Sequence, residues 1–169
     1  MKVKILTDGN ELINASIKKA VKMRLPDLND GWRFNFRKHA KKKGVRTYVL
    51  ITEKTPGIAE GCLIYKMIDD REPYMAYIEI APHNRGKGKE YDYVAGCLIA
   101  YASRLSFILG QDYYKGWLAF DIQEEHEKDS KKLMALYSGK YGAKRLDKTT
   151  KMLITPENGE KLIEKYLTY

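Results

Sequence analysis

The feature that most constrains the fold is a series of apolar strands that ends in a short basic loop and leads into a long apolar helix. Three segments are rich in Ile, Tyr and Val and are separated by turn residues: 47–52, 58–67 and 74–81. This pattern predicts an antiparallel meander. After the loop, an apolar stripe runs from Val94 to Leu109 and stops at Gly110, which predicts a helix.

The rest of the chain divides into further strands and helices. We expect strands over residues 2–6 and 116–122, a hairpin over 143–146 and 151–154, and helices over 11–24, within 30–46, over 129–138 and from 155 onward. The 11–24 helix is predicted from the spacing of Ile13, Ile17, Ala20 and Val21. Thr155 and Pro156 are typical N-cap and first-turn residues for the last helix.

This mixed order, with no linker or internal repeat, predicts one domain over residues 1–169. The fold class is α/β (α+β), with a mixed, mostly antiparallel central sheet flanked by helices. We expect the two cysteines, Cys62 and Cys97, to be buried thiols, because two cysteines cannot form a disulfide scaffold.

The chain is basic, with 31 Lys and Arg against 22 Asp and Glu and a net charge of +9. Such a charge indicates an anionic partner: a nucleic acid, a membrane surface or a phosphate-bearing cofactor. The longest apolar stretch, Val94 to Ala102, is too short to span a bilayer, and the first residues do not resemble a secretory signal. We therefore expect a cytoplasmic protein with no membrane partner.

The loop Arg85-Gly86-Lys87-Gly88 between a strand and a helix is the strongest chemical signal. Glycines allow a tight turn that presents backbone N–H groups, and a helix start adds unpaired N–H groups of its own. With the charges of Arg85, Lys87 and Lys89, this arrangement suits a pyrophosphate. The alternative is a solvated basic turn. The spacing matches neither a Walker loop nor a Rossmann fingerprint.

This segment resembles the signature of the GNAT superfamily of acetyl-CoA-dependent N-acyltransferases. Residues 80–90 read Ile-Ala-Pro-His-Asn-Arg-Gly-Lys-Gly-Lys-Glu, where the family has Val-x-Pro-like residues and then Arg-Gly-x-Gly-x-Gly/Ala at a helix start. Glu90 replaces the last small residue. A second block, Leu136-Tyr137 followed by Gly142, resembles the family's Leu-Tyr and Gly-Phe pair, with one extra residue in the gap and Ala143 in place of Phe.

The resemblance implies an N-acetyltransferase that uses acetyl-CoA and no metal, and that acts directly on a primary amine. In the family, the loop amides hold the pyrophosphate of coenzyme A and the preceding strand pairs with its pantetheine arm. By resemblance, the cofactor contacts fall on Ile80, Arg85, Gly86, Lys87, Gly88, Lys89 and Ser130. Glu90 replaces the small residue of the last pyrophosphate contact. Either a local rearrangement or a longer loop ahead of the helix, near Asp92, would accommodate this larger, charged side chain.

The resemblance also suggests catalytic residues. Tyr137 would be the general acid toward the leaving sulfur, and a backbone N–H near Ile80 would serve the oxyanion. Glu79 is the candidate base, directly or through a water, with Glu72 as a weaker candidate. Each has an alternative: Tyr137 as a core tyrosine, and Glu79 as a cross-strand charge partner to a lysine.

A basic run near aromatic residues, 37–43, remains outside this assignment. It fits a solvated surface, an RNA-binding surface, or an intermediate case in which some of these charges contact the acceptor. Three functions therefore stay open: an N-acetyltransferase for a small-molecule or protein amine, a binding or regulatory module with weak or no catalysis, and an acetyltransferase with an RNA-linked acceptor. The chain is expected to be a monomer or a homodimer.

Overall fold

A computed structural model describes residues 1–167 and contains one nine-stranded sheet in the order β6-β1-β2-β3-β4-β5-β7-β9-β8. The strands are β1 (Lys2–Thr7), β2 (Leu12–Lys19), β3 (Val45–Thr52), β4 (Gly61–Ile68), β5 (Glu72–Ile80), β6 (Tyr91–Asp92), β7 (Leu118–Asp121), β8 (Lys144–Arg145) and β9 (Lys151–Ile154). The helices are α1 (Phe36–His39), α2 (Val94–Leu109), α3 (Glu127–Tyr141) and α4 (Pro156–Leu167).

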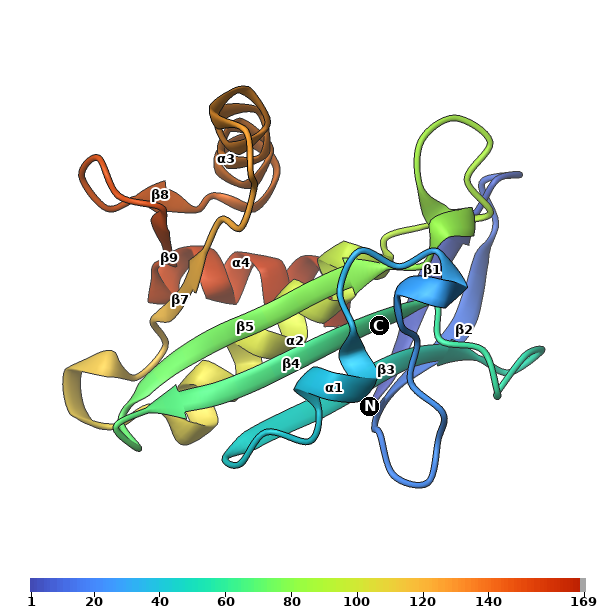
Figure 1. Cartoon of the computed structure of the whole chain (residues 1–169), viewed down its shortest axis with the longest axis horizontal. Helices are drawn as coiled ribbons and strands as arrows, with labels where there is room; N and C mark the ends of the chain where they lie inside the picture. The colour runs from blue at the N-terminus through green and yellow to red at the C-terminus, as the bar shows by residue number, and fades with distance from the viewer. Residues whose placement is uncertain (168–169) are drawn as a thin grey trace.

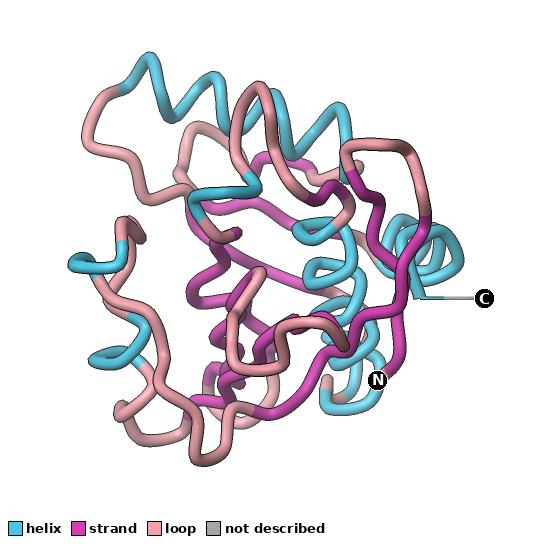
Figure 2. Tube along the Cα trace, turned by 90° about the vertical axis from the view of Figure 1, so that its right-hand side faces the viewer, coloured by secondary structure: helices cyan, strands magenta, loops and turns pink. Residues whose placement is uncertain are grey.

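The sheet lies between two unequal layers (Figure 1). Helices α2 and α4 cover one face, and α1 with the segment before it covers the other. Figure 2 shows the strands between these layers, with α3 along one end. Each face has its own core: the α2 side includes Leu98 and Tyr166, and the α1 side includes Trp32, Phe36 and Ile64. Burial of these apolar side chains is the main stabilising contribution.

Most elements predicted from the sequence are present. The meander is β3–β4–β5, the helix that ends at Gly110 is α2, and β8 and β9 form the expected antiparallel pair. A short helix, α1, lies within 30–46, and Thr155 Oγ1 accepts the N–H of Asn158 at 3.3 Å as the N-cap of α4. Both cysteines are buried free thiols, and burial raises the pKa of Cys97 to about 12.

The prediction of a helix over 11–24 was wrong, because this segment forms β2. Ile13, Ala15 and Ile17 alternate with polar residues, so one face of a strand collects all three. Both edges of β2 are paired, to β1 and to β3. The same isoleucines also fit a helical spacing, and the neighbouring strands decided between the two patterns.

One pairing in the sheet is parallel and very short. Strands β5 and β7 are matched only at Tyr74 and Ala119. A register shift between β4 and β5 leaves Ala76 as an extra residue, which is a β-bulge. Beyond Tyr74 the two parallel strands separate, and a cavity opens between them. No helix among residues 1–167 is long and apolar enough to cross a membrane.

Candidate active site

A cavity of about 330 Å³ opens where β5 and β7 separate. We call it the β5–β7 cavity. It is lined by strand residues, by α2 and by α3, and it also reaches the segment before α1 through Arg33 and Phe34. The cavity brings together Glu79, Ile80, Arg85 and Tyr137, which the sequence had placed in two separate blocks.

The loop at the end of β5 has a backbone that requires glycine at two positions. Gly86 and Gly88 have φ angles of 66° and 74°, in the left-handed region. An added Cβ would meet no atom within 4 Å at either position, so the space around both is open. Within residues 1–167, the backbone N–H groups of residues 86–89 donate no hydrogen bond. Such a loop can offer several donors to one anion.

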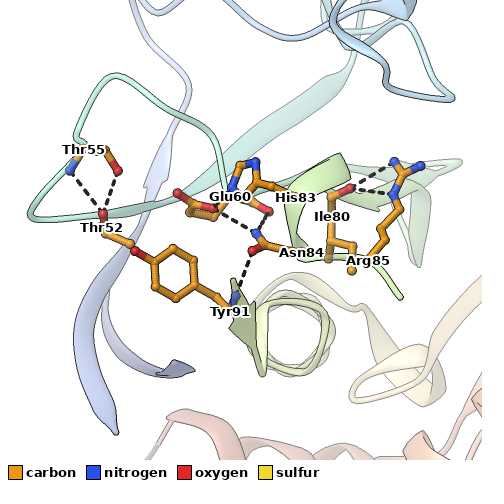
Figure 3. Close-up of polar contacts among 8 residues, drawn as sticks. All are labelled: Thr52, Thr55, Glu60, Ile80, His83, Asn84, Arg85 and Tyr91. Carbon is orange, nitrogen blue, oxygen red and sulfur yellow. Dashed lines mark hydrogen bonds and ion pairs between the residues drawn. The ribbon is translucent and has the colours of Figure 1, made fainter. Parts of the chain in front are cut away.

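A buried carboxylate fixes the base of this loop (Figure 3). Glu60 is 2% exposed, and its Oε2 lies 2.5 Å from His83 Nε2 and accepts from Asn84 Nδ2 at 2.9 Å. Asn84 Oδ1 in turn accepts the N–H of Tyr91 at 3.0 Å. The loop is therefore anchored on both sides. Sequence reasoning missed Glu60, although a lone acidic residue at the start of an apolar strand was a signal for it.

The helix does not start directly at the glycine loop: a longer loop precedes it, which is one of the two arrangements that the sequence analysis allowed. Helix α2 begins at Val94, behind Tyr93, whose φ is 71°, and behind the short strand β6. Asp92 Oδ1 accepts the N–H of Tyr93 at 2.8 Å, and Lys89 Nζ donates to Asp92 Oδ2 at 2.7 Å. Burial alone would raise the pKa of Asp92, but hydrogen bonds from Lys89 and from the amide of Tyr93 lower it overall. The carboxylate of Asp92 therefore lies at the start of α2, where its negative charge disfavours binding of an anion at the helix N-terminus.

Arg85 folds back from the loop into the cavity. Its Nε and Nη2 donate to the carbonyl of Ile80 at 3.2 and 3.0 Å, and Nη2 also pairs with Glu79. Figure 3 shows the guanidinium turned toward Ile80. The side chain of Arg85 thus covers the edge of β5 that the family resemblance assigns to pantetheine. A phosphate bound at the loop would compete with Ile80 and Glu79 for its guanidinium.

Glu79 holds two segments together. It is 9% exposed, and its oxygens accept the backbone N–H groups of Arg33 and Phe34, each at 2.8 Å. With Arg85 as a third donor, this carboxylate is fully engaged. The geometry supports a positioning role for Glu79, and its role as a base remains a prediction.

Tyr137 lines the cavity from α3. Its ring packs against Phe120 and Tyr141, with centroids 4.8 and 5.8 Å away. Burial raises its pKa to about 12, opposed by the charge of Arg33, so the phenol is neutral at ordinary pH. Within residues 1–167 its hydroxyl has no hydrogen-bond partner. A neutral, unpaired hydroxyl in a cavity can donate a proton or a hydrogen bond to a ligand.

Other site residues from the sequence analysis do not line this cavity: Glu72, Ser130 and the loop residues Gly86, Lys87, Gly88 and Lys89. Glu72 is at the opposite end of β5, where it pairs with Lys151 at 2.8 Å. Ser130 lies in the first turns of α3. His83 belongs to the Glu60 network.

Sequence reasoning missed two polar residues at the point where β5 and β7 separate. Gln123 Nε2 donates to the carbonyl of Ala76 at 3.1 Å, across the opening. Asp121 accepts from the hydroxyl of Tyr74 at 2.5 Å and from Thr150 at 2.9 Å. A polar residue at the end of a buried strand was the available signal for both.

The residues present fit coenzyme A in two respects. The loop has free amides and glycines that allow close approach, and β5 has an edge that is not paired with β7 beyond Tyr74. The carboxyl groups of Glu90 and Asp92 follow the loop, and their negative charge would repel the second phosphate of the pyrophosphate. Among residues 1–167, no group of three or more His, Cys, Asp or Glu side chains is arranged to hold a metal ion.

Comparison with known proteins places this fold. No family model matches the chain, and no curated protein matches its sequence. Among solved structures, the KacTA–DNA complex matches with a TM-score of 0.58 at 14% identity, over 89% of this chain and 99% of that one. A tyrosine-to-phenylalanine mutant of the AtaT toxin, bound to the C-terminus of the antitoxin AtaR and acetyl-CoA, matches at 0.55 and 15%, over 88% and 98%.

A third structure, the AtaT–AtaR complex bound to DNA, matches with a TM-score of 0.56 at 16% identity, over 88% of this chain and 99% of that one. These neighbours are GNAT-fold acetyltransferases, so the predicted GNAT fold is confirmed.

Proposed function

Because the chain has the GNAT fold, we propose that it transfers an acetyl group from acetyl-CoA to a primary amine. The overall reaction forms the N–C bond of an amide, breaks the C–S bond of a thioester, and moves one proton from the amine to the released thiol. The observation that carries the proposal is the β5–β7 cavity. It joins the glycine loop, through Arg85 and Ile80, to the unpaired hydroxyl of Tyr137.

Each part of this cavity has a proposed task. The amides of residues 86–89 and the side chains of Arg85 and Lys87 hold the phosphates, and the free edge of β5 holds the pantetheine arm. Acetyl-CoA supplies the acetyl group as a thioester. Tyr137 donates a hydrogen bond or a proton toward the leaving sulfur.

For the proton of the amine we propose a water as the immediate acceptor, with Glu79 as the candidate that orders this water. Direct contact of the amine with a carboxylate is disfavoured, because each carboxylate that lines the cavity already has hydrogen-bond or ion-pair partners. Glu79 holds two amides and Arg85, Asp121 holds Tyr74 and Thr150, and Glu124 pairs with Arg33.

Calorimetry with acetyl-CoA, followed by a thiol-release assay over a panel of amines, tests the proposal. Binding is expected below about 1 mM, the upper end of ordinary KM values. Lys87→Gln removes one positive charge from the glycine loop and should weaken acetyl-CoA binding. Lys41→Gln removes the same charge at an exposed position outside the loop and serves as its matched control. Absence of heat at 1 mM acetyl-CoA in the wild-type chain would reject the proposal.

A second function, a CoA-binding or regulatory module without turnover, is favoured by one specific observation. The carboxylate of Asp92 lies at the start of α2 and forms an ion pair with Lys89, so the charge of Lys89 is partly neutralised. If acetyl-CoA binds and no amine releases thiol, this second function replaces the first.

A further inference from the structure

A second, smaller cavity lies on the other face of the sheet, under α1. Its volume is about 210 Å³, and its polar lining residues are His39, Lys42, Lys66, Tyr74, Tyr77 and Gln123. We call it the basic pocket. Ala76, Tyr77 and Gln123 line both this pocket and the β5–β7 cavity. The two cavities therefore meet where β5 and β7 separate, one on each side of the sheet.

The cationic side chains of the basic pocket have no acidic partner. Lys42 Nζ lies 5.5 Å from the ring centre of Tyr77, and Lys66 Nζ lies 5.3 Å from that of Tyr74. Within residues 1–167, neither ammonium has a carboxylate oxygen within 4 Å. The carboxylate of Asp121 contacts the lining through the hydroxyl of Tyr74, which donates a hydrogen bond to it. The pocket therefore has an excess of positive charge.

His39 gives a second indication that this pocket is a binding site. Its ring stacks on Tyr77 at 4.1 Å with an interplanar angle of 17°. Its Nδ1 atom is buried and has no hydrogen-bond partner within residues 1–167. Buried polar atoms are nearly always satisfied, so an unsatisfied one beside a cavity points to a group that arrives from outside.

We propose that the basic pocket receives an anionic group of the acceptor, a carboxylate or a phosphate, while the acceptor's amine reaches the β5–β7 cavity past Gln123. This inference rests on the proposed function. It assigns His39 and Lys42 of the basic run 37–43 a direct contact with the acceptor. It also disfavours polyamines, because Lys42 and Lys66 would repel a cationic chain.

Amide NMR spectra of the full chain, titrated with matched pairs of small amines, test the pocket without requiring turnover. O-phosphoethanolamine is compared with ethanolamine, and β-alanine with propylamine, so the two arms separate phosphate from carboxylate. The anionic member of at least one pair should shift amides of α1 and of residues 74–77. Lys42→Gln and Lys66→Gln should each weaken that binding about tenfold, roughly one charge-assisted hydrogen bond, and Lys41→Gln should not.

Either of two results would overturn the inference. Shifts confined to the glycine loop would place the anion in the phosphate site of coenzyme A. Equal binding of the amines with and without the anionic group, or equal loss in the Lys41 and Lys42 variants, would remove the selective contact.

Thiol release with the same amines separates this inference from the proposed function. Release with ethanolamine or spermidine at least as fast as with the anionic amines keeps the acetyltransferase and removes the anionic acceptor. No release with any amine, together with the expected NMR shifts, removes the acetyltransferase and keeps the anion pocket. Faster release with the anionic amines supports both.

Discussion

Replacing Tyr137 with phenylalanine removes one oxygen atom from the β5–β7 cavity and leaves the ring in place. The hydroxyl has no partner within residues 1–167, so no buried donor or acceptor is orphaned by its loss. The ring keeps its contacts with Phe120 and Tyr141. We therefore expect the free energy of unfolding to change by no more than about 0.5 kcal/mol.

The effect on the rate follows from the acid strength of the phenol. The pKa of Tyr137 is about 12, whereas a free thiol titrates near 8.5. The phenol is thus a weaker acid than the thiol it serves, and its main contribution is a hydrogen bond to the developing thiolate. We expect the low end of general-acid effects, about a hundredfold loss in kcat, equivalent to about 2.7 kcal/mol.

The assay is thiol release at saturating acetyl-CoA and amine, measured from pH 6 to pH 9 beside thermal unfolding. Because the phenol stays protonated over this range, the ratio of wild-type to variant kcat should not change with pH. Tyr101→Phe is the matched control, since Tyr101 is a partly buried tyrosine of α2 outside the cavity. Equal kcat for wild type and Tyr137→Phe at every pH would refute the reasoning.

Three further predictions follow from the packing. Gly96→Ala should cost about 1–3 kcal/mol in urea unfolding, because the new Cβ would lie 2.4 Å from the ring of Tyr166, whereas Gly139→Ala has open space and should not destabilise the chain. Gly88→Ala should weaken acetyl-CoA binding in calorimetry, while Gly44→Ala, with the same left-handed strain of about 1 kcal/mol, should reduce only stability. Burial, with the charges of Lys42 and Lys38, lowers the pKa of His39, so the unfolded chain binds more protons, and stability should fall as pH drops below about 6.5. Thermal unfolding of His39→Gln should show a weaker decline than His126→Gln; equal declines would exclude His39 as its source.

The sequence predicted the order of elements where one pattern dominated. The meander, α2 and α4 have strong alternation, a long apolar stripe or clear caps, and all three were found. The error at 11–24 arose because Ile13 and Ile17 fit both the helical and the strand spacing. Only the pairing of this segment with β1 and β3 decides in favour of a strand. Strand β6 is two residues long and has no pattern of its own.

The site was predictable only where its residues are close in sequence. Arg85 to Lys89 form one motif, and the structure places them as a loop at the end of β5. The contacts that shape the site join distant segments, such as Glu60 with Asn84 and Glu79 with Arg33. Local spacing carries no information about such pairs. The basic pocket likewise exists only because α1 packs beside Tyr77.

The Glu60 network has a thermodynamic consequence for any phosphate that binds the loop. Asn84 and Tyr91 fix both ends of the glycine loop before a ligand arrives. Little backbone entropy is then left to lose on binding, which lowers the cost of association. The binding free energy would depend instead on the release of water and on the exchange of the Arg85 contacts with Ile80 and Glu79 for contacts with the phosphate. The enthalpy of binding should therefore depend strongly on Arg85. A loop held in this way acts as a rigid receptor rather than one that folds around its ligand.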